Sequence, residues 1–311
     1  YKRQSPTCTA CSARTWSVSY APNRTRTRCR PSAVTDVAAA EMLVDSHVHV
    51  ASSDEQRYPR HPTGAGSTWW QHARGVEGLL VHLDTSEVDR AVVVQAVGIY
   101  GFDCRYAADV TAGRDRLALV GAIDMAGPDV GASVERLSST TELAGLRLFG
   151  VDSEGAGWLT DGAGSTIWNL ASRTGCVLVP TIFGDALPAL RQRMEQCPDV
   201  DVALDHCAFP DLGGPDAMAP LLGLADLTRL HLKVTSHNLD TDGDPAVFLD
   251  ALVEAFGPER VCLGSDHPQH QTKTYPEMLG IARHAARNLS AADRASFLGG
   301  NALRLWWRHA G

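Results

Sequence analysis

The sequence lacks any long hydrophobic run. No stretch of its 311 residues approaches the length of about 18 uncharged apolar residues by which a membrane-spanning helix is recognised. No integral membrane role and no membrane partner are therefore expected. Apolar residues make up 44% of the chain and charged residues 21%, a balance typical of globular proteins with a large buried core.

Positive charge is also scarce outside the first 41 residues. Residues 42–311 contain 21 basic and 34 acidic side chains, a net charge of −13, whereas residues 1–41 carry seven basic and two acidic side chains. Nucleic-acid binding requires clustered lysine and arginine to neutralise phosphates. The acidic body of the chain therefore argues against a nucleic-acid partner.

No cysteine pattern indicates a disulfide framework. Cys8 and Cys11 have the C-x-x-C spacing, but no second pair completes a zinc site. Isolated cysteines in apolar runs behave as small buried hydrophobic residues. Five of the eight cysteines are scattered singly beyond residue 41: Cys104, Cys176, Cys197, Cys207 and Cys262. This usage predicts a reducing, cytoplasmic environment.

The first 41 residues differ from the rest of the chain. They are rich in arginine, serine, threonine and proline, and they show no hydrophobic period. Such a composition cannot bury enough apolar surface to offset the entropy lost on ordering, so residues 1–41 are predicted to be disordered. Two origins stay open: an organellar transit peptide, or a natural start at Met42 behind a spurious extension. We favour the second and place the folded domain at residues 42–311.

From residue 43 onward, short apolar runs alternate with segments of helical period. The runs are rich in Val, Leu and Ile, with the near-continuous hydrophobicity of parallel strands that are buried on both faces. They are Leu43–Val48, Ala91–Ala96, Leu117–Ile123, Gly145–Phe149, Cys176–Ile182, Val200–Asp205, Leu230–Thr235 and Val261–Gly264. Eight strands that alternate with helices predict an α/β fold, the (β/α)8 or TIM barrel.

An open doubly wound sheet is the alternative architecture. That fold would place a G-x-G-x-x-G turn after the first strand, whereas this chain continues into Asp45-Ser46-His47-Val48-His49. Asp244-Pro245 supplies a helix start, with Asp at the N-cap and Pro in the first turn. The clearest helical periods are Thr166–Thr174, Ala186–Gln196, Pro245–Phe256 and Tyr275–Asn288. The barrel is the preferred prediction.

Polar side chains suited to catalysis fall at the ends of three predicted strands. His47 and His49 are two residues apart in the first strand, so their imidazoles lie on the same side. His206 follows the sixth strand and Asp266 the eighth. The carboxyl ends of barrel strands meet at one face, so the four residues are expected to converge there. Such a set can hold a divalent metal or deprotonate a water, although each residue alone also has a purely structural explanation.

At these positions the sequence resembles a known family. V-D-S-H-V-H at 44–49 is similar to the opening motif of the amidohydrolase superfamily. Further elements narrow the resemblance to its amidohydrolase 2 group, which includes 2-pyrone-4,6-dicarboxylate lactonase, sugar-acid lactonases and aminocarboxymuconate-semialdehyde decarboxylase. These elements are Tyr58-Pro59, Gln95, Tyr100-Gly101-Phe102-Asp103, Gly145-Leu146-Arg147, Leu204-Asp205-His206, Gly264-Ser265-Asp266 and Asn301-Ala302. The resemblance covers residues 42–311, and the lactonase branch is the nearer one.

Several positions depart from the pattern of that group. Arg147 stands where binuclear members carry a carboxylated lysine, and the fifth strand offers no histidine. Asp103-Cys104 replaces an Asp-Asn pair, and His267 replaces an aromatic residue. The resemblance therefore implies no binuclear site. It leaves either no metal or one divalent ion, zinc or manganese, held by His47, His49, His206 and Asp266.

The resemblance implies hydrolysis of a lactone in a small, carboxylate-bearing substrate. Asp266 would act as general base toward water. His47, His49 and His206 would polarise the carbonyl, directly or through one metal ion. Two alternatives stay open: non-oxidative decarboxylation of an unsaturated or aromatic acid at the same site, and a barrel that binds a small molecule without catalysis. Homo-oligomerisation is also left open.

Substrate binding is assigned to a second set of residues. Arg147 would clamp a substrate carboxylate through its planar guanidinium. Its structural alternative is an ion pair with Asp45 or Asp152. The further candidates for the substrate pocket are Tyr100, Arg105 and Gln95.

Overall fold

The part of the chain that the structure, a computed structural model, describes comprises residues 42–62, 68–71, 74–151, 155–213, 216–270 and 272–307. The predicted extension, residues 1–41, lies outside these residues, so its disorder stays a prediction. No helix within the described ranges combines the length and the apolar character needed to cross a bilayer.

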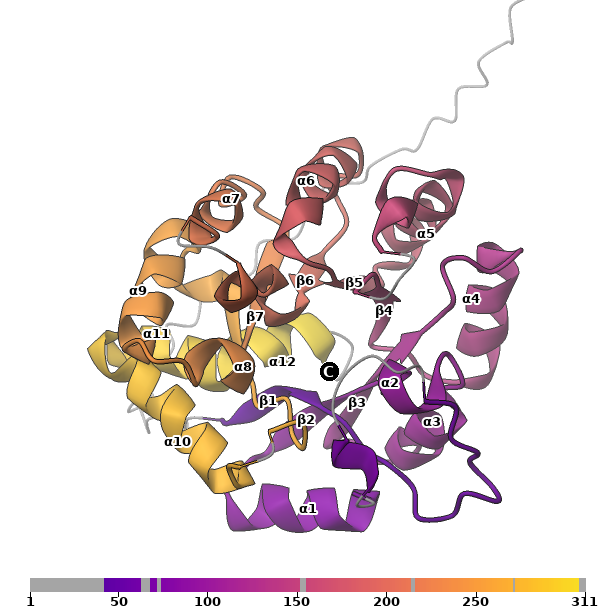
Figure 1. Cartoon of the computed structure of the whole chain (residues 1–311), viewed down its shortest axis with the longest axis horizontal. Coiled ribbons are helices and arrows are strands. Elements are labelled where there is room, and N and C mark those ends of the chain that lie inside the picture. Colours follow the sequence, from indigo (N-terminus) through magenta and orange to yellow (C-terminus); the bar gives the residue numbers. More distant parts are fainter. Residues whose placement is uncertain are drawn as a thin grey trace, which may run out of the picture. The chain divides into compact units, whose positions relative to one another are not determined.

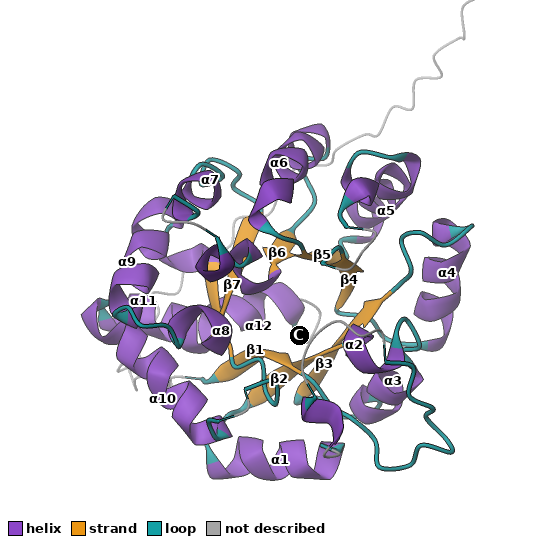
Figure 2. Cartoon of the chain, viewed as in Figure 1, coloured by secondary structure: helices purple, strands orange, loops and turns teal. Residues whose placement is uncertain are grey.

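Eight parallel strands form the centre of the fold, and each pairs with the next one in sequence (Figure 2). They are β1 (Val44–Val48), β2 (Arg90–Val94), β3 (Leu117–Ala122), β4 (Gly145–Phe149), β5 (Val177–Thr181), β6 (Val202–Leu204), β7 (Leu230–Thr235) and β8 (Val261–Gly264). Backbone hydrogen bonds join the end of β1 to the segment after β8: Asp266 N–H to the His47 carbonyl (2.9 Å) and His49 N–H to the His267 carbonyl (2.7 Å). The predicted (β/α)8 barrel is confirmed. Seven of the eight predicted runs contain one strand, and the second overlaps β2, which begins one residue earlier, at Arg90.

Helices surround the strands (Figure 1). Those in the described ranges are α1 (Val76–Thr85), α2 (Val97–Tyr100), α3 (Arg105–Thr111), α4 (Val130–Thr140), α5 (Gly162–Thr174), α6 (Leu187–Gln196), α7 (Met218–Leu222), α8 (Ser236–Leu239), α9 (Pro245–Phe256), α10 (Tyr275–Ala285), α11 (Ala291–Ala295) and α12 (Asn301–Trp306). Asp244 caps α9 as predicted, since its side chain accepts from Ala246 N–H. α5 starts four residues earlier than its periodicity suggested, because Asp161 caps it by accepting from Gly164 N–H.

The half of the barrel interior at the amino ends of the strands, called the lower half below, is apolar; the upper half lies at their carboxyl ends. Small and branched side chains from several strands form a separate buried cluster with α12. Its buried members are Val44, Val92, Val94, Ala118, Val120, Val177, Val179, Ala203, Cys262, Ala302, Leu305 and Trp306. Figure 1 shows α12 within the ring of outer helices, where it packs beneath the strands. This cluster closes the end of the barrel opposite to the site.

Strand alternation then determines which residues line the upper half. Val177 and Val179 belong to the apolar cluster, so Thr181 is the next inward position of β5. By the same period, Asp205 lies above Ala203 at the end of β6. In β1 the register shifts between Asp45 and Val48. This irregularity allows Val44 and His47 to face inward together although they are an odd number of residues apart.

Candidate active site

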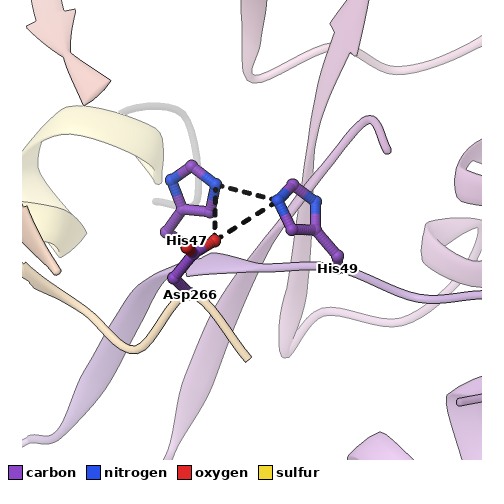
Figure 3. Close-up of side chains that lie close together, drawn as sticks. All are labelled: His47, His49 and Asp266. Atoms are coloured by element: carbon purple, nitrogen blue, oxygen red, sulfur yellow. Dashed lines mark hydrogen bonds and ion pairs between the residues drawn. The ribbon is translucent and has the colours of Figure 1, made fainter. Parts of the chain in front are cut away.

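Two histidines and one aspartate meet at the upper end of the barrel (Figure 3). The Nε2 atoms of His47 and His49 lie 3.2 Å apart. Asp266 Oδ1 is 3.6 Å from the first of them and 3.5 Å from the second. All three residues are at most 7% exposed. The predicted convergence of His47, His49 and Asp266 is therefore present in the structure.

The backbone around β8 directs Asp266 toward the histidines. Asp266 has a φ of 59°, a left-handed conformation that a residue with a side chain adopts only when its surroundings enforce it. Asp45 provides part of that enforcement, because its Oδ1 accepts from the backbone N–H groups of Ser265 (2.8 Å) and His47 (3.1 Å). The Tyr275 hydroxyl donates to the other oxygen of Asp45 at 2.9 Å. Asp45 thus joins the ends of β1 and β8.

An acceptor oxygen on the far side of each ring assigns the histidine tautomers. His49 Nδ1 lies 2.8 Å from the Val94 carbonyl, which can only accept, so Nδ1 carries the proton. His47 Nδ1 lies 3.2 Å from Asp205 Oδ1, in the contact range of an ion pair, and this carboxylate oxygen likewise favours a proton on Nδ1. In the neutral imidazoles both Nε2 atoms then bear lone pairs that face each other. Asp266 Oδ1 adds a third acceptor, and no described group donates a hydrogen bond to it.

His206 lies beside this triad on an unusual turn. β6 ends at Leu204, one residue before its predicted end, and φ is positive from His206 through Phe209. Such left-handed backbone costs about 1–2 kcal/mol per residue. Asn238 helps to hold the turn through a 2.8 Å hydrogen bond from Nδ2 to the His206 carbonyl. The His206 ring centroid lies 4.8 Å from that of His47, and its Nδ1 bonds the Thr235 hydroxyl at 2.8 Å.

Protonation states follow from burial and neighbouring charge. Burial lowers the pKa of His206 to about 4. Burial and the nearby Lys233 ammonium hold the pKa of His47 well below its ordinary value. Burial alone would raise the pKa of Asp266, but the imidazoles of His206, His49 and His47 outweigh it and lower that pKa. At neutral pH the site therefore presents the ionised carboxylate of Asp266 beside the neutral imidazoles of His47 and His206.

Asp205 is the central contact of the polar layer below, and the sequence pattern did not identify it as a site residue. It is fully buried, and its carboxylate lies 2.8 Å from Lys233 Nζ and 3.2 Å from His47 Nδ1 through Oδ1. Through Oδ2 it accepts from the Thr181 hydroxyl (2.7 Å) and from Arg147 Nε (3.2 Å). Burial opposes its ionisation, yet the Lys233 ammonium, the His47 ring and the Arg147 guanidinium hold its pKa well below the usual range. The sequence feature that could have indicated this network is Lys233, a single lysine within the strand β7.

Arg147 combines structural contacts with a place at a cavity. It is 5% exposed, and it donates to Thr181, to Asp205 and, through Nη1, to the Gln95 carbonyl. Its ion-pair partner is thus Asp205, not Asp45, and Asp152 lies outside the described residues. Arg147 also lines a small cavity of about 70 Å³ together with His49, Trp69, Trp70, Phe149 and Gln269. Its role toward a substrate carboxylate stays a prediction.

The three other candidates for substrate binding have contacts away from the triad. Gln95 Nε2 donates to the carbonyls of Gly101 and Asp103, so its side chain holds the loop after α2. The Tyr100 hydroxyl accepts from the Ser52 backbone N–H at 2.8 Å. The Arg105 side chain is 64% exposed and pairs with Asp103. None of these contacts reaches His47, His49 or Asp266, and the substrate-binding roles stay predictions.

Comparison with known proteins now places this site in a family. A family model described as amidohydrolase (Amidohydro_2) matches residues 44–308, which span all eight strands and the triad. The chain belongs to the amidohydrolase 2 family. The resemblance found in the sequence is confirmed, and with it the assignment of this amidohydrolase to the hydrolases.

Three individual proteins are similar to this chain at low sequence identity, between 17% and 25%. L-fucono-1,5-lactonase of Burkholderia ambifaria is 25% identical over 252 residues, which cover 75% of this chain and 84% of the lactonase. A zinc-bound amidohydrolase from Burkholderia multivorans matches in structure with a TM-score of 0.71 at 23% identity, over 86% of this chain and 99% of that one. A probable 2-pyrone-4,6-dicarboxylic acid hydrolase from Acinetobacter baumannii matches with a TM-score of 0.70 at 17% identity, over 85% and 99% of the two chains. These two structures share the fold.

Proposed function

We propose that this amidohydrolase opens a lactone in a small, carboxylate-bearing substrate. The lactonase relative supports the reaction, because its match extends over most of both chains. The observation that carries the proposal is the meeting of Asp266 with the Nε2 atoms of His47 and His49. An ionised carboxylate and two nitrogen lone pairs are thereby directed at one point of the barrel mouth, where water and a carbonyl group can meet.

The triad also fits one divalent metal ion. Lone pairs 3.2 Å apart repel each other unless a cation or a shared proton lies between them. Two imidazole nitrogens and a carboxylate oxygen suit zinc or manganese, with His206 as the adjacent imidazole. Within the described residues, the two groups with metal-ligand spacing share His47, which favours one ion over two. Such an ion supplies Lewis acidity, which polarises a carbonyl oxygen and makes water a stronger acid.

Asp266 moves the proton in the proposed reaction. Its lowered pKa keeps it ionised, so it can accept a proton as the water oxygen bonds to the lactone carbonyl carbon. When the tetrahedral intermediate collapses, the ring C–O bond breaks and Asp266 returns the proton to the departing oxygen. One water is consumed and a hydroxy acid is released.

Arg147 would orient the substrate. Its Nε and Nη1 are engaged by Thr181, Asp205 and the Gln95 carbonyl, whereas its Nη2 makes no hydrogen bond with a described residue. A guanidinium held in this way is preorganised to bind a carboxylate with little further loss of entropy. This arrangement favours substrates that carry a carboxylate next to the lactone.

The decisive experiment assays purified protein against a panel of lactones with and without a carboxylate, with proton release as the signal. We expect carboxylate-bearing lactones to be hydrolysed fastest. Activity should fall on dialysis against a chelator and return with zinc or manganese. Release of carbon dioxide from an unsaturated or aromatic acid, with no lactone opened, would overturn the proposal and support decarboxylation.

A further inference from the structure

Lys233 is a buried charge that the proposed reaction does not use. It is one of only three lysines in the chain, and its side chain is fully buried in β7 between Leu232 and Val234. Its Nζ lies 2.8 Å from Asp205 Oδ1, and it also lies 5.6 Å from the ring centroid of Trp306 in α12. A buried ammonium is unfavourable unless it is paired. An apolar side chain would fill this position without the cost of burying a charge, which points to a purpose of the ion pair beyond packing.

Asp205 connects Lys233 to the triad. The oxygen that pairs with Lys233 is also the one that lies 3.2 Å from His47 Nδ1. The other oxygen is held by Thr181 and Arg147. With partners on both oxygens, the carboxylate cannot rotate without losing contacts on both sides. Without Lys233, Arg147 would be the only fixed cation on Asp205, and it would draw the carboxylate away from His47.

We propose that Lys233 is a positioning residue that fixes Asp205, so that Asp205 orients the His47 ring with Nε2 toward Asp266. A carboxylate behind a metal-binding histidine sets the tautomer and direction of the ring. Lys233 does not touch His47 in this scheme. It would act on the ring through the Asp205 carboxylate, which lies between them. The inference rests on the proposed function, because it gives His47 Nε2 a role in binding one metal ion.

A double-mutant cycle tests the proposal. Lys233→Met, Asp205→Asn and the double variant are compared in zinc affinity, kcat, KM and melting temperature. Lys233→Met should weaken zinc binding and lower kcat by about 10–100-fold, the usual loss for an outer partner of a metal ligand, and leave KM nearly unchanged. In the Asp205→Asn background the same substitution should change neither zinc affinity nor kcat, because Lys233 acts through Asp205.

Arg193 provides a matched control. It is another buried cation, 7% exposed, on the outer helix α6, and it donates to the Leu159 carbonyl and to the Ser165 hydroxyl. Arg193→Met should lower the melting temperature and leave zinc affinity as in the unmodified protein. The proposal is overturned if Lys233→Met behaves like Arg193→Met, or if its effects add to those of Asp205→Asn. Should Lys233→Met not fold, Lys233→Gln, which keeps a neutral donor, is judged by the same two criteria.

One spectroscopic measurement separates failure of this inference from failure of the proposed function. The Nδ1 proton of His47 should give a hydrogen-bonded resonance in ¹⁵N-histidine NMR spectra, and Lys233→Met should shift or broaden it. An unchanged resonance refutes the positioning role even if the enzyme hydrolyses lactones. A changed resonance in a protein that binds no zinc and opens no lactone would support the positioning role and reject the proposed function.

Discussion

The two halves of the barrel interior differ in chemistry although the same strands build both. The lower half is filled by Val, Ala, Leu and Trp side chains and is closed by α12. The upper half holds Asp205, Lys233, Arg147 and Thr181 beneath the triad. Apolar burial below contributes stability in proportion to the area removed from water. Buried ion pairs above add little net stability, because desolvation offsets their attraction.

This contrast shows where the fold can carry chemistry. In the lower half an apolar side chain of the right volume suffices, whereas in the upper half each polar group depends on a specific partner. Loss of function and loss of stability should therefore separate along the barrel axis. The following substitutions test that separation, from the largest expected effect to the smallest.

Asp266→Asn should produce the largest loss of activity. The substitution keeps the size of the side chain but removes the group that accepts the proton, so kcat should fall by about 10²–10⁴-fold. Its melting temperature should stay near that of the unmodified protein, because Asp266 lies above the apolar cluster. Asp250→Asn, on the surface of α9, serves as the control and should keep full activity. Near-normal turnover by Asp266→Asn would exclude it as the base.

Leu305→Ala should produce the largest loss of stability. Leu305 is 2% exposed in the apolar cluster of α12, and its truncation should lower the free energy of unfolding by about 2–5 kcal/mol. Below the melting transition kcat should not change. Denaturant unfolding measures the loss, with Val247→Ala, 67% exposed on α9, as the control within about 0.5 kcal/mol. A fall in kcat that matches the loss of stability would show that the two halves are coupled.

Arg147→Met should affect substrate binding more than turnover. Loss of a hydrogen bond to a charged group costs about 1.5–3 kcal/mol, which corresponds to about a tenfold or larger rise in KM. Preference for acidic lactones should weaken in parallel. Arg105→Met should have a smaller effect, because that guanidinium is exposed and paired with Asp103. If Arg147→Met only lowers the melting temperature, its contacts with Asp205 and Thr181 are its whole role.

Removal of residues 1–41 should have the smallest effect. Their basic, aperiodic composition predicts no contribution to the barrel. A chain that starts at Met42 should keep the kcat and melting temperature of the full chain. A fall of more than about 2–4 °C, which corresponds to about 1 kcal/mol in a domain of comparable size, would show that the segment packs against the barrel.

Much of the fold could be predicted because its signals are local. Each strand appears as a short run of apolar residues, and three helices begin at a capping aspartate: α4 at Asp129, α5 at Asp161 and α9 at Asp244. The triad could be predicted for a similar reason. His47, His49 and Asp266 lie at the ends of strands, and a barrel brings all such ends to one face. Family membership then followed from the same motifs.

The contacts between strands could not be read in this way. Gln95 and Tyr100 belong to the family motifs and were predicted to bind substrate. In the structure their side chains hydrogen-bond to loop backbone, at the Gly101 carbonyl and the Ser52 N–H. Arg147 pairs with Asp205, 58 residues further along the chain, rather than with Asp45, which the sequence analysis had named as a possible partner. Such partners depend on the register between neighbouring strands, which determines the inward-facing residues that lie side by side.

The sequence by itself determined the order of the strands, the barrel and the identity of the residues at its mouth, because hydrophobic period and strand ends are properties of neighbouring residues. Only the tertiary structure decided how those residues act. The shift of register in β1 turns His47 inward, Asp205 lies behind its ring, and the left-handed turn after β6 places His206 beside it. These features arise from packing between segments far apart in the chain, where the geometry of one strand constrains the side chains of another.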